Sequence, residues 1–380
     1  MMPENRHDNY LLFIIKVLGK GILLFLIFNL VVGLIPAGNR VGRVSLYNLL
    51  FPGRPRLPFG ENPQEAFNLS LYDLEAMFAS HEIHKASKPE NEFRILLIGD
   101  SATWGTLLKP DETLAGLINE YAFISDDGSN VKVYNLAYPG MSLLKDLIIL
   151  NQSLSYQPDL VIWPLTLESF PDAHQIETPL VAQNPQIVQP LIEAYGLPFS
   201  ENDENFFHPS FWERSLIGRR RVIFDAIQLQ FYGVLWTATG IDQTYPSDYT
   251  PAQRDFDAED VMYHKWQPPI LPLDQLRFEI IYAAHEMVGD IQILLVNQPI
   301  LISGGENSDV RYNFFYPRWV YDQYRDYLET IVQEEDWDYV DLWDEVPQNE
   351  FTNSAVHLTA RGSLMYFDAL KPAIEALINP

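Results

Sequence analysis

The chain has 380 residues, with 25 basic against 51 acidic side chains, so its formal net charge is -26. This balance argues against a nucleic-acid partner, because phosphate backbones are bound by basic surfaces. An apolar content of 47% excludes intrinsic disorder, and the absence of cysteine excludes disulfides, thiolate nucleophiles and cysteine-ligated metals. The eight histidines are scattered and match no metal-binding motif, so the sequence predicts no metal and no cofactor.

The N-terminal segment differs from the rest of the chain in charge and hydropathy. Residues 1–60 carry a net charge of +5, which leaves -31 for the remainder. Within them, residues 21–35 form an apolar run with Asn29 as its only polar side chain. Extended backwards, the run approaches the roughly 20 residues that span a bilayer, and Pro36 then ends the helix. A cleaved signal peptide and a buried core helix are alternatives, but no A-x-A site follows. We therefore predict a membrane anchor over residues 1–36, with its orientation left open by basic residues on both sides.

Residues 37–92 are predicted to hold a juxtamembrane linker, rich in Pro, Gly and Arg up to residue 60, and a helix over 71–86. From residue 93 onward, short apolar runs alternate with segments of helical spacing, which indicates a parallel sheet covered on both faces. The predicted strands are 94–98, 131–136, 159–163, 291–297 and 339–343. The predicted helices are 114–121, 142–154, 276–287, 316–334 and 362–378. The expected fold class is α/β, with three α/β/α layers around a five-stranded parallel sheet.

Residues 171–275 interrupt this alternation. They are rich in proline and aromatic residues, and the basic cluster Arg219, Arg220 and Arg221 precedes a helical stretch over 222–235. The segment falls between the third and fourth strands, where loops at the carboxyl ends of strands build ligand clefts. A cap subdomain that contacts substrate and a purely structural insertion are both compatible with this sequence. We therefore predict one domain over residues 93–380, which contains the sheet and the insertion 171–275.

Three short motifs carry residues suited to catalysis. Ser101 stands in GDSATWG directly after the first strand, where the ligand sites of parallel sheets form. Gly140 ends NLAYPG after the second strand and can offer a backbone N–H to a developing oxyanion. His357 stands in SAVHLTARG just before the last helix, where a general base that reaches the first strand's serine would lie.

Together these motifs resemble the nucleophile, glycine and C-terminal histidine motifs of the SGNH/GDSL hydrolase superfamily. The resemblance covers about residues 93–171 and 288–378, and it implies a flavodoxin-like three-layer fold. It also implies that Ser101 is the nucleophile, that His357 is the base, and that the N–H groups of Ser101 and Gly140 are oxyanion donors.

Two positions depart from the family's pattern. The family's third motif, G-x-N-D, is missing after the third strand, and Thr166 or Leu167 occupies the place of its oxyanion-binding Asn. The Thr166 hydroxyl is the candidate to replace that donor, provided that it points into the site. The acid three residues before the histidine is replaced by Ser354, which could orient the imidazole but not supply a negative charge. Glu168 is a further candidate for orienting His357, with Glu350 and Asp344 as other possible substitute acids.

Two functions therefore compete, with a structural envelope protein as a third possibility. The first is a membrane-anchored esterase or acyltransferase that acts on O-acyl esters of cell-envelope glycans. The second is a catalytically degenerate relative that binds glycan or supports a membrane O-acyltransferase. The layout of anchor and catalytic domain is similar to families that transfer D-alanine to lipoteichoic acid or acetylate polysaccharides. It implies an extracytoplasmic body, a glycan or acyl-carrier substrate, and a multi-span acyltransferase as partner. The retained Ser101, Gly140 and His357 favour activity.

Overall fold

The structure is a computed structural model that describes residues 6–34, 45–51, 53–60, 70–85, 87–241 and 248–379. Its centre is a five-stranded, all-parallel sheet with the strand order β2-β1-β3-β4-β5. The strands are β1 (Glu92–Leu97), β2 (Asn130–Asn135), β3 (Leu160–Leu165), β4 (Gln292–Asn297) and β5 (Tyr339–Asp341). All five predicted strands are confirmed, with boundaries shifted by one or two residues.

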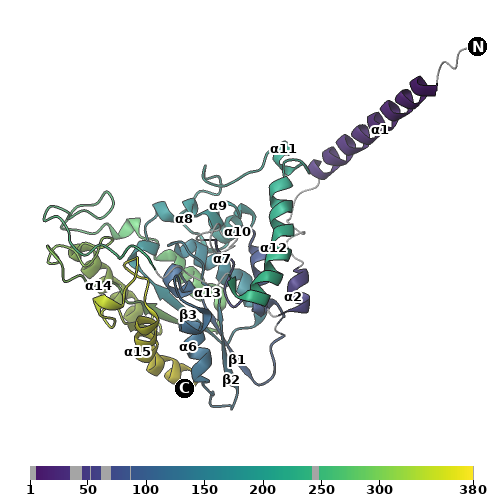
Figure 1. Ribbon diagram of the computed structural model, residues 1–380. Helices are drawn as coiled ribbons and strands as arrows, with labels where there is room; N and C mark the ends of the chain where they lie inside the picture. Colours follow the sequence, from purple (N-terminus) through teal and green to yellow (C-terminus); the bar gives the residue numbers. More distant parts are fainter. Residues whose placement is uncertain are drawn as a thin grey trace, which may run out of the picture.

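Helices cover both faces of the sheet, which confirms the three layers (Figure 1). Alternate residues of β1 belong to two separate apolar cores: Leu96 packs with the first and Ile95 with the second. The first core is completed by α4 (Leu74–Ser80), α7 (Leu143–Ser153), α13 (Glu279–Val288) and α14 (Arg318–Glu334). The second is completed by α6 (Leu114–Tyr121) and α15 (Ala360–Ile378). Because apolar side chains cover both faces, the strands are continuous apolar runs in the sequence.

Two predicted elements differ in detail. The helix expected over 71–86 is shorter: α4 ends at Ser80, and a 3-10 turn, η1, follows over Glu82–Lys85. His81 interrupts it because its backbone forms a parallel bridge to Arg54, which takes the chain out of helical geometry. Strand β3 runs on through Pro164, beyond the predicted end. Its ladder with β1 stops at Ile162, so the missing N–H of Pro164 is not needed there.

The segment between β3 and β4 holds several helices separated by irregular stretches where it is described. Its shorter elements include α8 (Ala173–Glu177), α9 (Pro179–Ala182), α10 (Pro185–Tyr195), α11 (Phe211–Arg214) and η6 (Leu273–Gln275). Its longest element is α12 (Arg220–Thr239). Residues 242–247 of the predicted insertion lie outside the described part of the chain. The remaining short elements are α2 (Leu46–Leu50), α5 (Ser101–Trp104), η2 (Pro110–Glu112), η3 (Leu154–Tyr156), η4 (Leu167–Ser169) and η7 (Gln348–Glu350).

The N-terminal helix α1 (Arg6–Leu34) projects away from the sheet domain (Figure 1). Its Tyr10–Leu34 stretch has a mean hydropathy of 2.5 and is the one helix of the described residues that is long and apolar enough to cross a membrane. A signal sequence near an N-terminus has the same properties. Pro36, predicted to end this helix, and residues 37–44 of the predicted linker lie outside the described residues.

A second apolar surface lies on α12, next to α2 and α11 (Figure 1). Leu229, Gly233 and Trp236 face the protein and are buried. The other side of the helix exposes Phe224 and Phe231, whose exposed fractions are 61% and 69%. Further exposed apolar residues on these elements are Leu46, Leu49, Leu50, Trp212, Ile217, Val222, Ile227, Val234 and Leu235. We call the exposed apolar side chains of α12 the α12 face.

Candidate active site

The candidate nucleophile follows β1 at the carboxyl edge of the sheet. Gly99 has a φ of +145°, and a Cβ there would lie 2.8 Å from Thr103 Oγ1. Both facts require glycine, and the turn they allow takes the chain directly from the strand into α5. Ser101 is the first residue of α5, and its side chain is half-buried.

Asp100 fixes the start of that helix. Its Oδ1 accepts a hydrogen bond from the Ala102 N–H at 2.8 Å, and its Oδ2 accepts one from Gln298 Nε2 at 2.8 Å. This N-cap links α5 to the residue that follows β4. Burial raises the pKa of the Asp100 carboxyl, which its hydrogen bonds and the nearby Lys145 partly offset. The aspartate of the GDS triplet thus holds Ser101 in place by contacts on both sides of the loop.

The loop after β2 lies beside the nucleophile loop because Leu97 and Asn135 stand opposite each other in the β1–β2 ladder. The Tyr138 N–H donates a hydrogen bond to the Gly99 carbonyl at 3.0 Å. Gly140 follows with a φ of +119°. Among the described residues, the backbone N–H groups of Ser101 and Gly140 have no hydrogen-bond acceptor. Two free donors in neighbouring loops are what an oxyanion site needs.

A buried lysine ties these two loops together. Lys145 Nζ donates hydrogen bonds to the carbonyls of Gly99 and Tyr138, both at 2.6 Å. It also forms an ion pair with Asp146 Oδ1 at 2.7 Å, and both side chains are buried. Burial raises the pKa of Asp146 to about 6, although the lysine beside it acts in the opposite direction. The sequence analysis did not single out this pair, although two charges within the apolar run of α7 are a visible signal.

The candidate base is carried by a short loop ahead of α15. A bridge between Phe351 and Leu358 closes this loop, and the Thr352 N–H donates to the His357 carbonyl at 2.8 Å. His357 Nε2 lies 2.8 Å from Ser101 Oγ. Its Nδ1 lies 2.8 Å from Oδ1 of Asn353. Because an amide oxygen only accepts, this contact places the imidazole proton on Nδ1 and leaves Nε2 free to accept the serine proton.

Asn353 therefore occupies the place that the sequence analysis assigned to Ser354 or Glu168, and both of those predictions are corrected. The closed loop turns the side chain four residues before His357 toward its ring, whereas Ser354 is buried and forms no hydrogen bond with that ring. The carboxylate of Glu168 is engaged by Tyr263, which donates to it at 3.0 Å. Glu350 accepts a hydrogen bond from Thr359 at the start of α15, and Asp344 makes no contact with His357.

The electrostatics of the pair follow from this arrangement. Burial lowers the pKa of His357 to about 4, so the imidazole is neutral and able to accept a proton throughout the neutral range. Asn353 carries no charge that would stabilise an imidazolium. The imidazole of His357 is thus placed to accept the Ser101 proton, and its low pKa makes it a weak proton acceptor.

Thr166 does not take over the role of the missing oxyanion Asn. Its side chain is fully buried, and its hydroxyl is hydrogen-bonded to the hydroxyl of Tyr316. The Glu168 N–H also donates to that tyrosine oxygen, at 3.1 Å. Tyr316 comes from the segment just before α14 and holds Thr166 inside the protein. The expectation that Thr166 donates to the oxyanion is therefore corrected, and two backbone donors remain.

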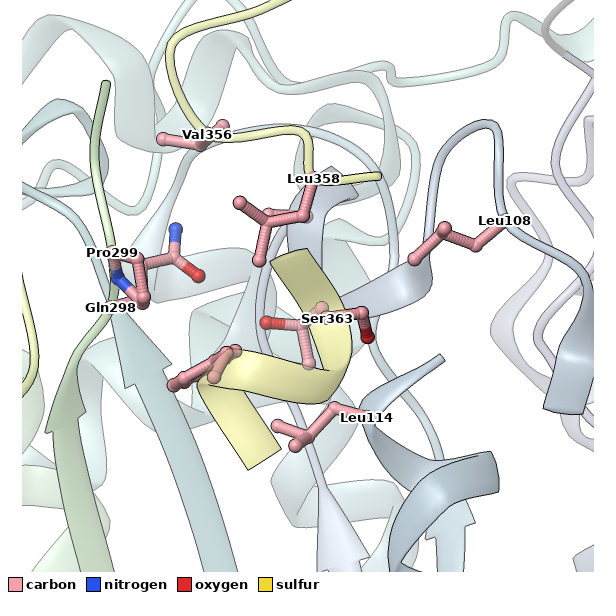
Figure 2. Close-up of a pocket in the computed structure, with 10 residues that line it drawn as sticks. Leu108, Leu114, Gln298, Pro299, Val356, Leu358 and Ser363 are labelled. Carbon is pink, nitrogen blue, oxygen red and sulfur yellow. The ribbon is translucent and has the colours of Figure 1, made fainter. Parts of the chain in front are cut away.

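A small cavity is lined by sequence neighbours of both Ser101 and His357 (Figure 2). It is lined by residues that follow Ser101 in α5, that flank His357, and that begin α15, together with the end of β4. The lining residues are Ala102, Thr103, Leu108, Leu114, Gln298, Pro299, Val356, Leu358, Ser363 and Tyr366. The cavity thus lies between the loop of His357, α5 and α15.

Comparisons with known proteins give distant similarity only. No protein-family profile matches the chain, and no curated protein is significantly similar to it. The fold is similar to a solved carbohydrate acetylesterase family member from Sinorhizobium meliloti, at a TM-score of 0.32 and 12% identity over 75% of this chain and 98% of that one. It is also similar to TesA, at a TM-score of 0.36 and 11% identity over 75% of this chain and 99% of that one. A family two carbohydrate esterase from Cellvibrio japonicus has a TM-score of 0.34 and 11% identity over 77% of this chain and 63% of that one. At such scores the similarity says nothing about substrate, and the chemistry has to be argued from the geometry of this chain.

Proposed function

We propose that this protein is an SGNH-type serine esterase or acyltransferase with Ser101 as nucleophile and His357 as base. The observation that carries the proposal is the 2.8 Å distance between Ser101 Oγ and His357 Nε2. In the first step Oγ attacks an ester carbonyl carbon while Nε2 takes its proton. The alcohol then leaves with that proton, and an acyl-serine remains. Water or a sugar hydroxyl takes the acyl group in a second step that uses the same base.

The N–H groups of Ser101 and Gly140 stabilise the oxyanion in both steps. They have no other acceptor in the described structure, and the Gly99 and Tyr138 carbonyls beside them are held by Lys145. Loss of one oxyanion donor typically costs about 10²–10³-fold in rate. With two donors and a neutral Asn353, turnover of simple esters will be slower than in an enzyme with a full complement of donors and an acid.

The natural site of action is a membrane surface, with α1 as a single-pass anchor and the sheet domain outside the cytoplasm. Two observations support this part: the length and hydropathy of Tyr10–Leu34, and the exposed α12 face on the same side of the molecule (Figure 1). The substrates are O-acyl esters of cell-envelope glycans or an acyl carrier, and the partner is a multi-span membrane O-acyltransferase. These assignments are supported by the similarity in layout to envelope-modifying families.

A second candidate function is a degenerate relative that binds glycan or supports such an acyltransferase without turnover. It is favoured by Asn353 in place of an acid and by the burial of Thr166. The short distance between Ser101 and His357 weighs against it, because a site kept only for binding has no need of an aligned nucleophile and base.

Hydrolysis of p-nitrophenyl acetate by the purified chain decides between the two. We expect Ser101→Ala to reduce kcat by at least roughly 10³-fold. A fluorophosphonate probe should label the wild type and Ser155→Ala, which changes an exposed serine, but not Ser101→Ala. Equal turnover by the wild type and Ser101→Ala, together with no labelling, would establish the degenerate function instead.

A further inference from the structure

Three side chains from separate segments converge beside the active site. They are Glu168 in η4, His174 in α8 and His264 in the segment between α12 and η6. One ligand atom from each lies within 4.8 Å of the others. Glu168 Oε1 lies 2.9 Å from His264 Nε2 and 3.5 Å from His174 Nδ1. None of these groups takes part in the proposed ester chemistry.

The surroundings of the Glu168 carboxylate distinguish this cluster from an ordinary surface ion pair. The carboxylate is only 9% exposed, and its other oxygen accepts a hydrogen bond from the buried Tyr263 at 3.0 Å. Within the described part of the chain, its ion-pair partners are the two histidines. A buried carboxylate is stabilised by a cation beside it, and a bound metal ion would supply that charge.

The local backbone also favours this convergence. His264 has a φ of +49°, a left-handed conformation that non-glycine residues adopt at a cost. That turn directs its ring toward Glu168 and against the ring of His174, whose centroid lies 4.9 Å away. Both histidine side chains remain about one-third exposed, so a metal ion can enter from solvent.

We propose that Glu168, His174 and His264 form a binding site for a divalent transition-metal ion, with Zn²⁺ as the preferred occupant. Two histidines and one carboxylate are a ligand set that zinc uses when a fourth position stays open to water. In a tetrahedral site neighbouring ligand atoms lie roughly 3.4 Å apart, close to both measured distances from Oε1. Tyr263 holds the second carboxylate oxygen, as the outer hydrogen bonds of metal sites do.

The site lies at the rim of the ester site. Thr178 donates a hydrogen bond to the His174 carbonyl at 2.7 Å. The same threonine stands beside Gly140, where a Cβ would lie 3.5 Å from its Cγ2. A metal ion would join η4 and α8, which border the oxyanion loop, to the segment that carries His264. We infer that it fixes the rim of the cleft, and this inference does not depend on the proposed esterase activity.

Cobalt binding tests the proposal directly. The untagged full chain, purified in detergent and treated with chelator, is titrated with Co²⁺ and then with Zn²⁺. We expect one Co²⁺ per chain with visible absorption bands, displacement by an equivalent of Zn²⁺, and a rise of a few degrees in Tm. Glu168→Gln and His264→Ala should each weaken binding at least tenfold, whereas His84→Ala, which removes an exposed histidine elsewhere, should not.

The circular dichroism spectrum and the Tm of the metal-free protein, measured on the same samples, report whether each variant is folded. Absence of a one-to-one cobalt complex in the wild type would overturn the metal site, and the three side chains would then form only ion pairs. Cobalt binding that persists in the folded variants Glu168→Gln and His264→Ala would also overturn it. Neither result would affect the esterase proposal, which rests on Ser101 and His357.

Discussion

The sheet and the region around α12 differ in whether their apolar side chains are buried. Every residue of β3 is buried between two helical layers, and the charged Lys145 and Asp146 nearby are paired. Around α12, by contrast, large apolar side chains such as Phe231 are exposed. The sheet domain thus buries its apolar side chains within itself, whereas the α12 face leaves a large apolar surface exposed. A bilayer next to α1 would cover that surface.

The largest effect on stability is expected from breaking the buried ion pair between Lys145 and Asp146. Lys145→Met leaves the Asp146 carboxylate buried without its cation and removes both ties to the catalytic loops. We expect a loss of about 3–5 kcal/mol in the free energy of unfolding. Lys132→Met is the matched control, because its ion pair with Glu82 is partly exposed and should contribute less than about 1 kcal/mol. Urea unfolding measures the free energy of unfolding of both variants. Equal losses would show that the buried ion pair contributes no more to stability than the partly exposed one.

The complementary experiment removes the apolar character of the α12 face. A chain that begins at residue 45 should still bind lipid vesicles, and the double substitution Phe224→Glu and Phe231→Glu should weaken that binding by roughly 10²-fold. Leu364→Glu is the control, since it changes an exposed apolar residue on α15, on the opposite face of the sheet. Vesicle sedimentation gives the partition coefficient. Unchanged binding would mean that this face meets a protein partner or another copy of the chain.

Within the site, the contribution of Asn353 should be modest. Asn353→Ala removes one hydrogen bond to an imidazole that is already packed in its loop, so kcat/KM should fall about tenfold. Asn353→Asp should raise it, because a carboxylate stabilises the imidazolium that forms during proton transfer. Ser354→Ala should change little, as its side chain does not contact His357. A larger effect at Ser354 than at Asn353 would restore the arrangement predicted from the family motif.

The smallest expected change is in the pH profile. A histidine with a pKa of about 4 is neutral above that value, so kcat/KM should be flat from about pH 5 upward. Below about pH 4 it should fall tenfold per unit as the base becomes protonated. Asn353→Asp should shift this limb to higher pH. A fall in kcat/KM of the wild type centred near pH 6.5 would show that burial does not lower the pKa of His357.

The sequence predicted the five strands and the parallel sheet correctly because both faces of the sheet are buried, which leaves continuous apolar runs. It also predicted the pairing of Ser101 with His357, which the short motifs and their places at strand ends made visible. It failed for Asn353 because the family spacing pointed one residue too late, and only the closed loop shows which side chain turns inward. The convergence of Glu168, His174 and His264 was invisible, since His264 is distant in the chain from the other two and the three follow no metal-binding spacing.

Two contacts join α1 to the segment around α11. Asn29, the single polar side chain in the apolar run, accepts a hydrogen bond from the Ile217 N–H at 2.9 Å, and Phe211 packs against Gly33. With α1 in a bilayer, as proposed, Tyr10 to Asn29 spans roughly 30 Å, the thickness of the hydrocarbon layer. The domain would then be clamped at the surface and not swing on a tether. Ser101 could act only on acyl groups presented within a narrow layer above the lipid headgroups.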